Sequence, residues 1–164
     1  MTVPVSRGQL YLIDTSAHAR SDHPAVRRVI AGLIGDRVAA TCVTVELEAG
    51  YSGRDAADVK IIAGRRRRLY VSLPISEAIA ERAREVQVRM AARGHHRAAG
   101  VVDLLTAAVA EHHGAVVLHY DADFEHIATS TGQPHAWSCR QGRSIDLDGD
   151  GGPQVAMNTF LTSV

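Results

Sequence analysis

Four carboxylic acids stand directly after apolar runs of the chain. They are Asp14, Glu46, Asp103 and Asp121. A carboxylate just beyond a buried strand, or in the first turn of a helix, is held at the carboxyl edge of a sheet, where open α/β folds build their sites. An all-oxygen set of this kind suits Mg²⁺ or Mn²⁺ better than zinc or copper. Because grouped carboxylates repel one another unless a divalent ion compensates their charge, the pattern indicates a hard-cation site.

A site of this composition suits the hydrolysis of a phosphodiester. A divalent ion lowers the pKa of bound water, orients that water, and neutralises the charge that builds up on a phosphate during in-line displacement. Each acid also has an ordinary structural role, since Asp103 could cap a helix and Asp121 or Asp123 could belong to a turn. The shared position of the acids after predicted strands is what predicts cleavage of a nucleic-acid backbone.

Apolar runs and helical periodicity alternate along the chain and predict the elements that position these acids. The predicted strands are 10–13, 38–43, 69–71, 115–120 and 136–137, and the predicted helices are 24–34, 44–49, 55–63, 76–93, 102–113 and 124–128. Thr44 is expected to cap the second helix and Gly64 to end the third. This alternation predicts an α/β fold with a parallel sheet, helices on both faces and right-handed crossovers.

The composition is that of one globular domain. The chain has 164 residues, no net formal charge and a sequence pI of about 7.1, which exclude a strongly basic nucleic-acid binder. No run approaches the roughly 18 apolar residues of a membrane span, and residues 1–7 lack the pattern of a secretion signal. We therefore expect no membrane association and a cytoplasmic location. Cys42 is expected in the core and His119 is expected to pack within the last clear strand.

Positive charge is concentrated in arginine, and five arginines are candidate RNA contacts because a guanidinium binds phosphate in a bidentate way. They are Arg65, Arg66, Arg67, Arg68 and Arg97. The competing interpretation of the run of four is a solvated helix end.

The character of the chain changes after residue 138. Residues 1–138 are predicted to form the domain, and residues 139–164 a loosely ordered or partner-dependent tail rich in Gly, Asp and Ser. Residues 146–151 look like the start of an EF-hand loop, but the twelfth position is Met157 and no flanking helices are predicted, which argues against calcium binding.

Four motifs in order resemble those of PIN-domain ribonucleases of the VapC toxin type, over roughly residues 10–137. They are Leu-Ile-Asp-Thr-Ser at 12–16, Thr-Val-Glu-Leu-Glu at 44–48, Asp-Leu-Leu-Thr-Ala-Ala at 103–108 and Asp-Ala-Asp-Phe-Glu-His-Ile-Ala at 121–128. The resemblance implies a PIN-like α/β/α sandwich with a central parallel sheet. It also implies a Mg²⁺-dependent endoribonuclease, with Mn²⁺ as an alternative ion, that is the toxin of a toxin–antitoxin pair. Its partners would be RNA, a cognate antitoxin and a second copy of the chain in a homodimer.

The resemblance also assigns roles by motif position. Asp14, Asp103 and Asp121 would hold the metal, Asp123 would be an auxiliary acid, and Glu46 would complete the quartet and position or deprotonate water. Thr15 or Ser16 would hydrogen-bond Asp14 or a water on the metal. The chain departs from the pattern at its end, because such toxins usually finish soon after the equivalent of Trp137 whereas this chain continues to Val164.

Two other functions would fit parts of this pattern. A PIN-like fold could serve as a catalytically weak RNA- or protein-binding module, but such a role would not need four mutually repelling acids. A receiver-like domain with an aspartyl phosphate also uses strand-end aspartates and Mg²⁺, but it needs a lysine at a strand end. Lys60, the single lysine of the sequence, falls in a predicted helix. The sequence leaves transfer, ribosomal and messenger RNA open as substrates.

Overall fold

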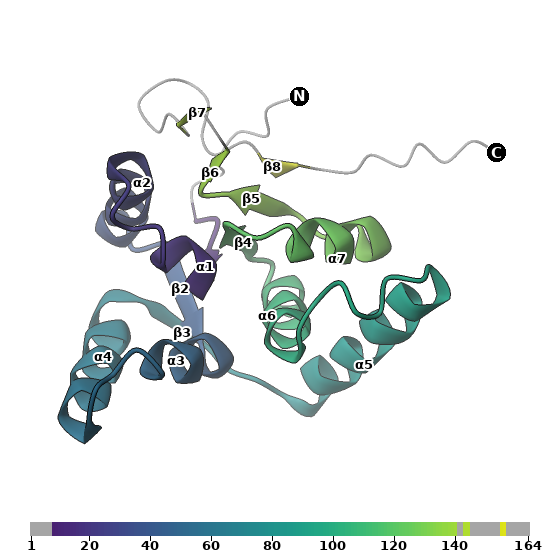
Figure 1. Cartoon of the computed structure of the whole chain (residues 1–164), viewed down its shortest axis with the longest axis horizontal. Coiled ribbons are helices and arrows are strands. Elements are labelled where there is room, and N and C mark those ends of the chain that lie inside the picture. The colour runs from purple at the N-terminus through teal and green to yellow at the C-terminus, as the bar shows by residue number, and fades with distance from the viewer. Residues whose placement is uncertain (1–7, 141–142, 145–154, 157–164) are drawn as a thin grey trace.

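The computed structural model describes residues 8–140, 143–144 and 155–156, and a mixed sheet lies at its centre (Figure 1). The strands are β1 Tyr11–Ile13, β2 Ala39–Cys42, β3 Val71–Leu73, β4 Val116–His119, β5 His135–Trp137, β6 Cys139–Arg140, β7 Arg143–Ser144 and β8 Val155–Ala156. Five of them are parallel in the order β3-β2-β1-β4-β5, and β8 adds an antiparallel pairing at the β5 edge. The prediction of a parallel sheet is confirmed.

Seven helices connect the strands in the described residues. They are α1 Thr15–His18, α2 Pro24–Gly35, α3 Val43–Gly50, α4 Ala56–Leu69, α5 Glu77–Ala92, α6 Val101–His112 and α7 Asp123–Thr131. Ser76 caps α5 by accepting a hydrogen bond from the Ile79 amide. Gly94 and Gly114 follow α5 and α6 with positive φ angles of 75° and 63°, the left-handed conformation that glycine adopts without strain.

Side chains alternate across the sheet and build a core on each face. Leu12 and Val117 point to one face, where they pack against α5, α6 and α7. Tyr11, Ile13 and Leu118 point to the other face, where they pack against α1 and α2. The period of two along each strand therefore produces a three-layer α/β/α sandwich. Figure 1 shows helices on both sides of the sheet.

The expected boundaries were wrong at three places. Gly64 lies inside α4, which runs on to Leu69, so the arginine run forms the end of the helix. One glycine costs a helix interior only about 1 kcal/mol, and arginines favour both the helix and its last turn. As a result β3 covers Val71–Leu73 rather than 69–71. α3 starts at Val43 after Cys42, so Thr44 is not its cap. The short helix α1 was not predicted.

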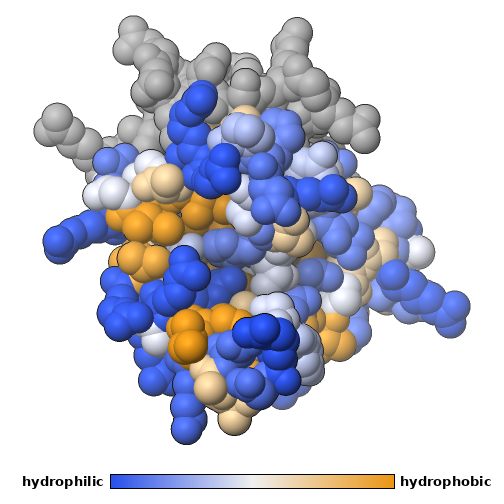
Figure 2. Space-filling model, turned by 60° about the vertical axis from the view of Figure 1, so that its left-hand side comes forward, coloured by the Kyte–Doolittle hydropathy of each residue, from blue (hydrophilic) through white to orange (hydrophobic). Residues whose placement is uncertain are grey.

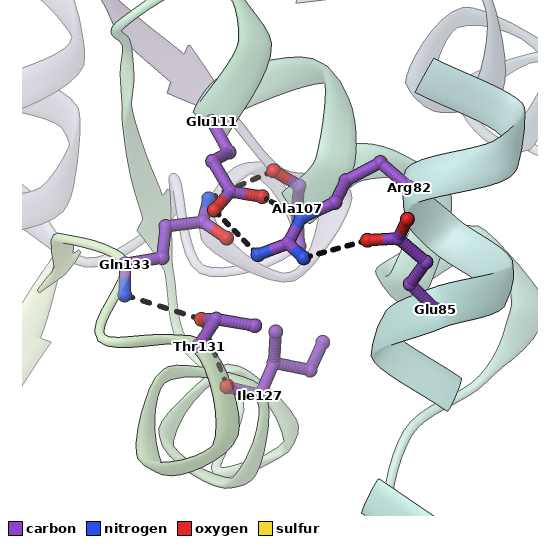
Figure 3. Close-up of polar contacts among 7 residues, drawn as sticks. All are labelled: Arg82, Glu85, Ala107, Glu111, Ile127, Thr131 and Gln133. Carbon is purple, nitrogen blue, oxygen red and sulfur yellow. Dashed lines mark hydrogen bonds and ion pairs between the residues drawn. The ribbon is translucent and has the colours of Figure 1, made fainter. Parts of the chain in front are cut away.

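A polar network joins the three helices of one face (Figure 3). Arg82 of α5 donates two hydrogen bonds to Glu111 of α6, at 2.7 and 2.8 Å, and a third to Glu85 at 3.0 Å. Gln133, after α7, donates from its side chain to the Ala107 carbonyl of α6 at 2.8 Å. Each charge in this network has a partner, so its role is to hold the layer together.

Other expectations are met or remain open. Cys42 is buried, as expected. Among the described residues, none of the helices has the length and apolar character to cross a membrane. The sequence that looks like an EF-hand, 146–151, lies outside the described residues. The division into residues 1–138 and 139–164 stays a prediction, to which the structure adds that β8 pairs with β5.

Candidate active site

Asp14 stands at the carboxyl end of β1 and caps α1. Its Oδ2 accepts a hydrogen bond from the Ser16 amide at 2.9 Å, and its own amide donates to the Leu118 carbonyl of β4 at 3.0 Å. The residue is only 3% exposed, and its Oδ1 is buried with no hydrogen-bond partner among the described residues. Burial raises the pKa of Asp14, and the nearby charge of Glu48 raises it further against the lowering effect of Ser16.

Asp103 is the third residue of α6, and its carboxylate folds back on the start of the helix. Its Oδ2 accepts a hydrogen bond from the Gly100 amide at 2.8 Å. A Cβ at position 100 would lie 3.0 Å from that oxygen, so glycine allows the close approach. Burial raises the pKa of Asp103 to about 6, and the charges of Asp14, Asp123 and Asp121 add to the rise. Four aspartates from three separate segments therefore lie within electrostatic reach of one another.

The loop after β4 is attached to α1. The Tyr120 amide donates to the Ser16 hydroxyl at 2.9 Å, and the Asp123 amide donates to Asp121 Oδ1 at 3.1 Å. Burial raises the pKa of Asp123, and the charge of Asp121 contributes in the same direction. Ser16 thus contacts both ends of the acidic cluster, by its amide to Asp14 and by its hydroxyl to the loop.

His119 packs under this loop, as the sequence predicts. Its Nδ1 accepts a hydrogen bond from the Asp121 amide at 3.3 Å, so Nε2 carries the proton and donates to His135 Nδ1 at 2.8 Å. Burial lowers the pKa of His119 to about 3, with a further contribution from His135. His119 is therefore neutral at pH 7 and holds the backbone of the loop.

The second motif contributes in a way that the sequence did not indicate. The Thr15 hydroxyl donates a hydrogen bond to Glu48 of α3, not to Asp14. Glu46 lies in the first turn of α3, and its charge and that of Asp14 both act on Arg66 of α4. In the sequence Glu48 stands out only as the last residue of the second motif, with no role assigned to it. Only the fold reveals its place beside Thr15.

The candidate arginines separate into two groups. Arg66 is buried, with 7% of its surface exposed, and burial lowers its pKa. The other four are exposed, three at the end of α4 and one in the loop before α6: Arg65, Arg67, Arg68 and Arg97. Lys60 is exposed on α4 rather than at a strand end, which removes the residue that an aspartyl-phosphate site would need.

The donor atoms of the acidic cluster are of the kind that a hard divalent cation prefers. The donors are all carboxylate oxygens, Asp14 Oδ1 is buried without a partner among the described residues, and burial together with the neighbouring carboxylates raises the pKa of Asp103. In the part of the chain that the structure describes, no three His, Cys, Asp or Glu side chains are close enough to hold one ion as they stand. Repulsion between the carboxylates keeps them apart when no ion is bound. We expect a bound cation to offset this repulsion and to draw the side chains inward.

Comparisons with known proteins identify the family. Residues 11–130 match the model of the PIN domain. Ribonuclease VapC21 of Mycobacterium tuberculosis is 42% identical over 129 residues, which cover 77% of this chain and 92% of that protein. Ribonuclease VapC51 of the same organism is 41% identical over 133 residues, covering 77% and 91%.

Solved structures agree on the fold. The DNA-bound VapBC of Salmonella typhimurium matches 80% of this chain and 99% of that chain with a TM-score of 0.62 and 16% identity. VapBC-1 of nontypeable Haemophilus influenzae matches 79% and 96% with a TM-score of 0.61 and 16% identity. The matched domain, the relatives and the shared fold together place this chain in the family of PIN-domain ribonucleases of the VapC type.

Proposed function

We propose that this chain is a Mg²⁺-dependent endoribonuclease and the toxin of a toxin–antitoxin pair, with Mn²⁺ able to replace Mg²⁺. The resemblance to PIN-domain nucleases of the VapC type implies dependence on a divalent metal. The observation that carries the proposal for this chain is the buried carboxylate of Asp103, whose pKa is raised by burial and further by the charges of Asp14, Asp123 and Asp121. Uncompensated acids in such a group weaken a fold, and a divalent cation removes that cost.

The proposed roles follow the positions of the residues in the four motifs. Asp14, Asp103 and Asp121 would hold the ion, with Asp123 as an auxiliary ligand. The ion would polarise water and neutralise charge on the phosphate. Glu46 would position the attacking water from the side of α3 and accept its proton. Ser16 would hold Asp14 and the loop after β4 in fixed positions through its two hydrogen bonds.

The partners are proposed from the neighbours and from the surface. The similar structures from Salmonella and Haemophilus are VapBC assemblies, and we propose a cognate antitoxin and a second copy of this chain as partners. Exposed apolar side chains on α3 and α4 support this, since Leu47 is 68% and Ile61 58% exposed. Figure 2 shows hydrophobic patches among charged side chains on that side of the molecule. We also propose that the protein acts in the cytoplasm, where its RNA substrate would be available.

The test is cleavage of total cellular RNA by purified, antitoxin-free protein, with Mg²⁺ or Mn²⁺ against EDTA. We expect discrete products that require the metal, and their loss in Asp103→Asn. Asp36→Asn is the matched control, because Asp36 is an exposed acid at the end of α2, outside the cluster. RNA left intact by folded protein under all conditions would contradict the proposal and favour a PIN-fold binding module.

A further inference from the structure

A hollow of about 520 Å³ lies between α1, α3 and α4. Thr15, His18, Glu48, Arg66 and Tyr70 contribute to its walls. Thr15 directly follows Asp14 and is held by Glu48, so the hollow adjoins the acidic cluster at the end of β1. A strand of RNA that lies across the cluster and continues toward α4 would therefore meet this hollow.

Arg66 is the unusual member of the wall. It is more than nine-tenths buried, and its Nη1 has no hydrogen-bond partner among the described residues. Its Cζ lies 5.6 Å from the centre of the Tyr70 ring, and no carboxylate of the described residues lies within 4 Å of its guanidinium. A buried cation with an unused N–H donor is costly to a fold. Because Nη1 lies out of reach of solvent, an anion in the hollow would compensate the charge of Arg66 from the side of the residue that lines the hollow.

The other groups of the wall select the kind of anion. Burial, assisted by the charge of Arg66, lowers the pKa of His18 to about 4, so His18 is neutral at pH 7. The charged groups of the wall are Arg66 and Arg65, which are positive, and Glu48, whose carboxylate accepts the hydrogen bond from the Thr15 hydroxyl. A guanidinium offers a planar fork that matches two phosphate oxygens. Phosphates repeat along a nucleic-acid strand. When one phosphate lies at the acidic cluster, the neighbouring phosphates of the strand therefore lie beside the cluster.

We infer that this hollow is a phosphate subsite of the RNA-binding surface, in which Arg66 binds a phosphate neighbouring the one that is cleaved. The inference rests on the ribonuclease function proposed above. The inference separates the roles of the arginines in the run 65–68. Arg66 lines the hollow, whereas Arg67 and Arg68 are exposed at the end of α4. Arg66 is thus a residue that binds substrate, distinct from the carboxylates that would hold the ion.

The test compares Arg66→Met with Arg68→Met, two variants that lose the same charge from the same helix. The probe is a labelled oligoribonucleotide that spans a cleavage site mapped from the digest of total RNA. We expect Arg66→Met to raise the RNA concentration at half-maximal rate about tenfold or more, and Arg68→Met less than threefold. In an Asp103→Asn background, which prevents cleavage, Arg66→Met should lower the slope of log affinity against log salt by about 1.

Arg66→Lys guards against a failure of Arg66→Met to fold, which a thermal melt would reveal. Lysine keeps the charge but not the fork, so we expect weaker RNA binding than in the wild type at an unchanged melting temperature. Equal effects of Arg66→Met and Arg68→Met would overturn the inference, since they indicate diffuse attraction. The inference would also be overturned if Arg66 variants changed the affinity for the metal but not for RNA. Arg66 would then only offset the charges of Asp14 and Glu46. Wild-type protein that cleaves no RNA would instead refute the proposed function.

Discussion

The two ends of α6 carry their charges in opposite ways. Near the C-terminal end, Glu111 is held by two hydrogen bonds from Arg82, which also compensates an acid placed at the unfavourable end of the helix dipole (Figure 3). Near the N-terminal end, Asp103 is favoured by the dipole but lies within reach of the charges of Asp14, Asp121 and Asp123. One end is arranged for stability, and the other concentrates charge of one sign. This contrast marks where a ligand is needed.

The largest expected effect comes from removing a charge at the acidic end. Asp14→Asn should lower metal-dependent cleavage by about 100-fold or more, because it removes a proposed ligand of the ion. The metal-free variant should keep its fold or gain stability, since one repelling charge is lost. Single-turnover cleavage and a thermal melt in EDTA measure the two parts. Cleavage at the wild-type rate would show that Asp14 holds no essential ion.

The pH dependence of stability should separate the acidic cluster from ordinary surface acids. The pKa of Asp103 is raised from 3.8 to about 6 in the folded protein, so the folded state binds this proton more tightly than the unfolded state. The resulting stability is fully present below pH 3.8 and is lost as pH rises through about 6. In EDTA, the free energy of unfolding should therefore fall by on the order of 2 kcal/mol more in the wild type than in Asp103→Asn.

Urea unfolding from pH 4 to pH 7 measures this difference. Asp36→Asn is the control, and its curve should follow that of the wild type. If the curves of wild type and Asp103→Asn stayed parallel over the whole range, the pKa of Asp103 would not be raised in the folded protein.

Addition of the metal should restore the stability that repulsion between the carboxylates takes away. At a concentration tenfold above the dissociation constant, Mg²⁺ should stabilise the folded state by about 1.4 kcal/mol, which raises the melting temperature by about 4 °C. Sodium chloride at equal ionic strength controls for screening. Asp103→Asn should lose most of the shift, whereas an equal shift in that variant would place the ion elsewhere.

The smallest effect is expected at the other end of α6. Arg82→Met should lower the stability by about 1 kcal/mol, because it leaves Glu111 without its partner in a partly exposed position. The cleavage rate of the folded variant should stay within about twofold of the wild type. Arg84→Met, which removes only exposed ion pairs, is the control and should not change the melting temperature. Loss of cleavage in Arg82→Met would mean that the two ends of α6 are not independent.

The sequence predicted the parallel sheet, and its apolar pattern singled out the three segments that carry the four aspartates, because each of these segments follows an apolar run directly. It failed where packing decides. Gly64 did not end α4, and with the helix extended Arg66 turned inward while its neighbours stayed exposed. Glu48 came to lie beside Thr15 through the way α3 packs on α1. No local pattern marks such contacts, because they join residues more than thirty positions apart.

The most direct test of the central claim is the crystal structure of the antitoxin-free protein soaked in Mn²⁺, read by anomalous scattering. The account predicts a peak bounded by Asp14, Asp103 and Asp121, with their carboxylates drawn inward, and no such peak in Asp103→Asn. A peak elsewhere, or none at a concentration of Mn²⁺ that supports cleavage, would contradict the claim that these acids form the metal centre.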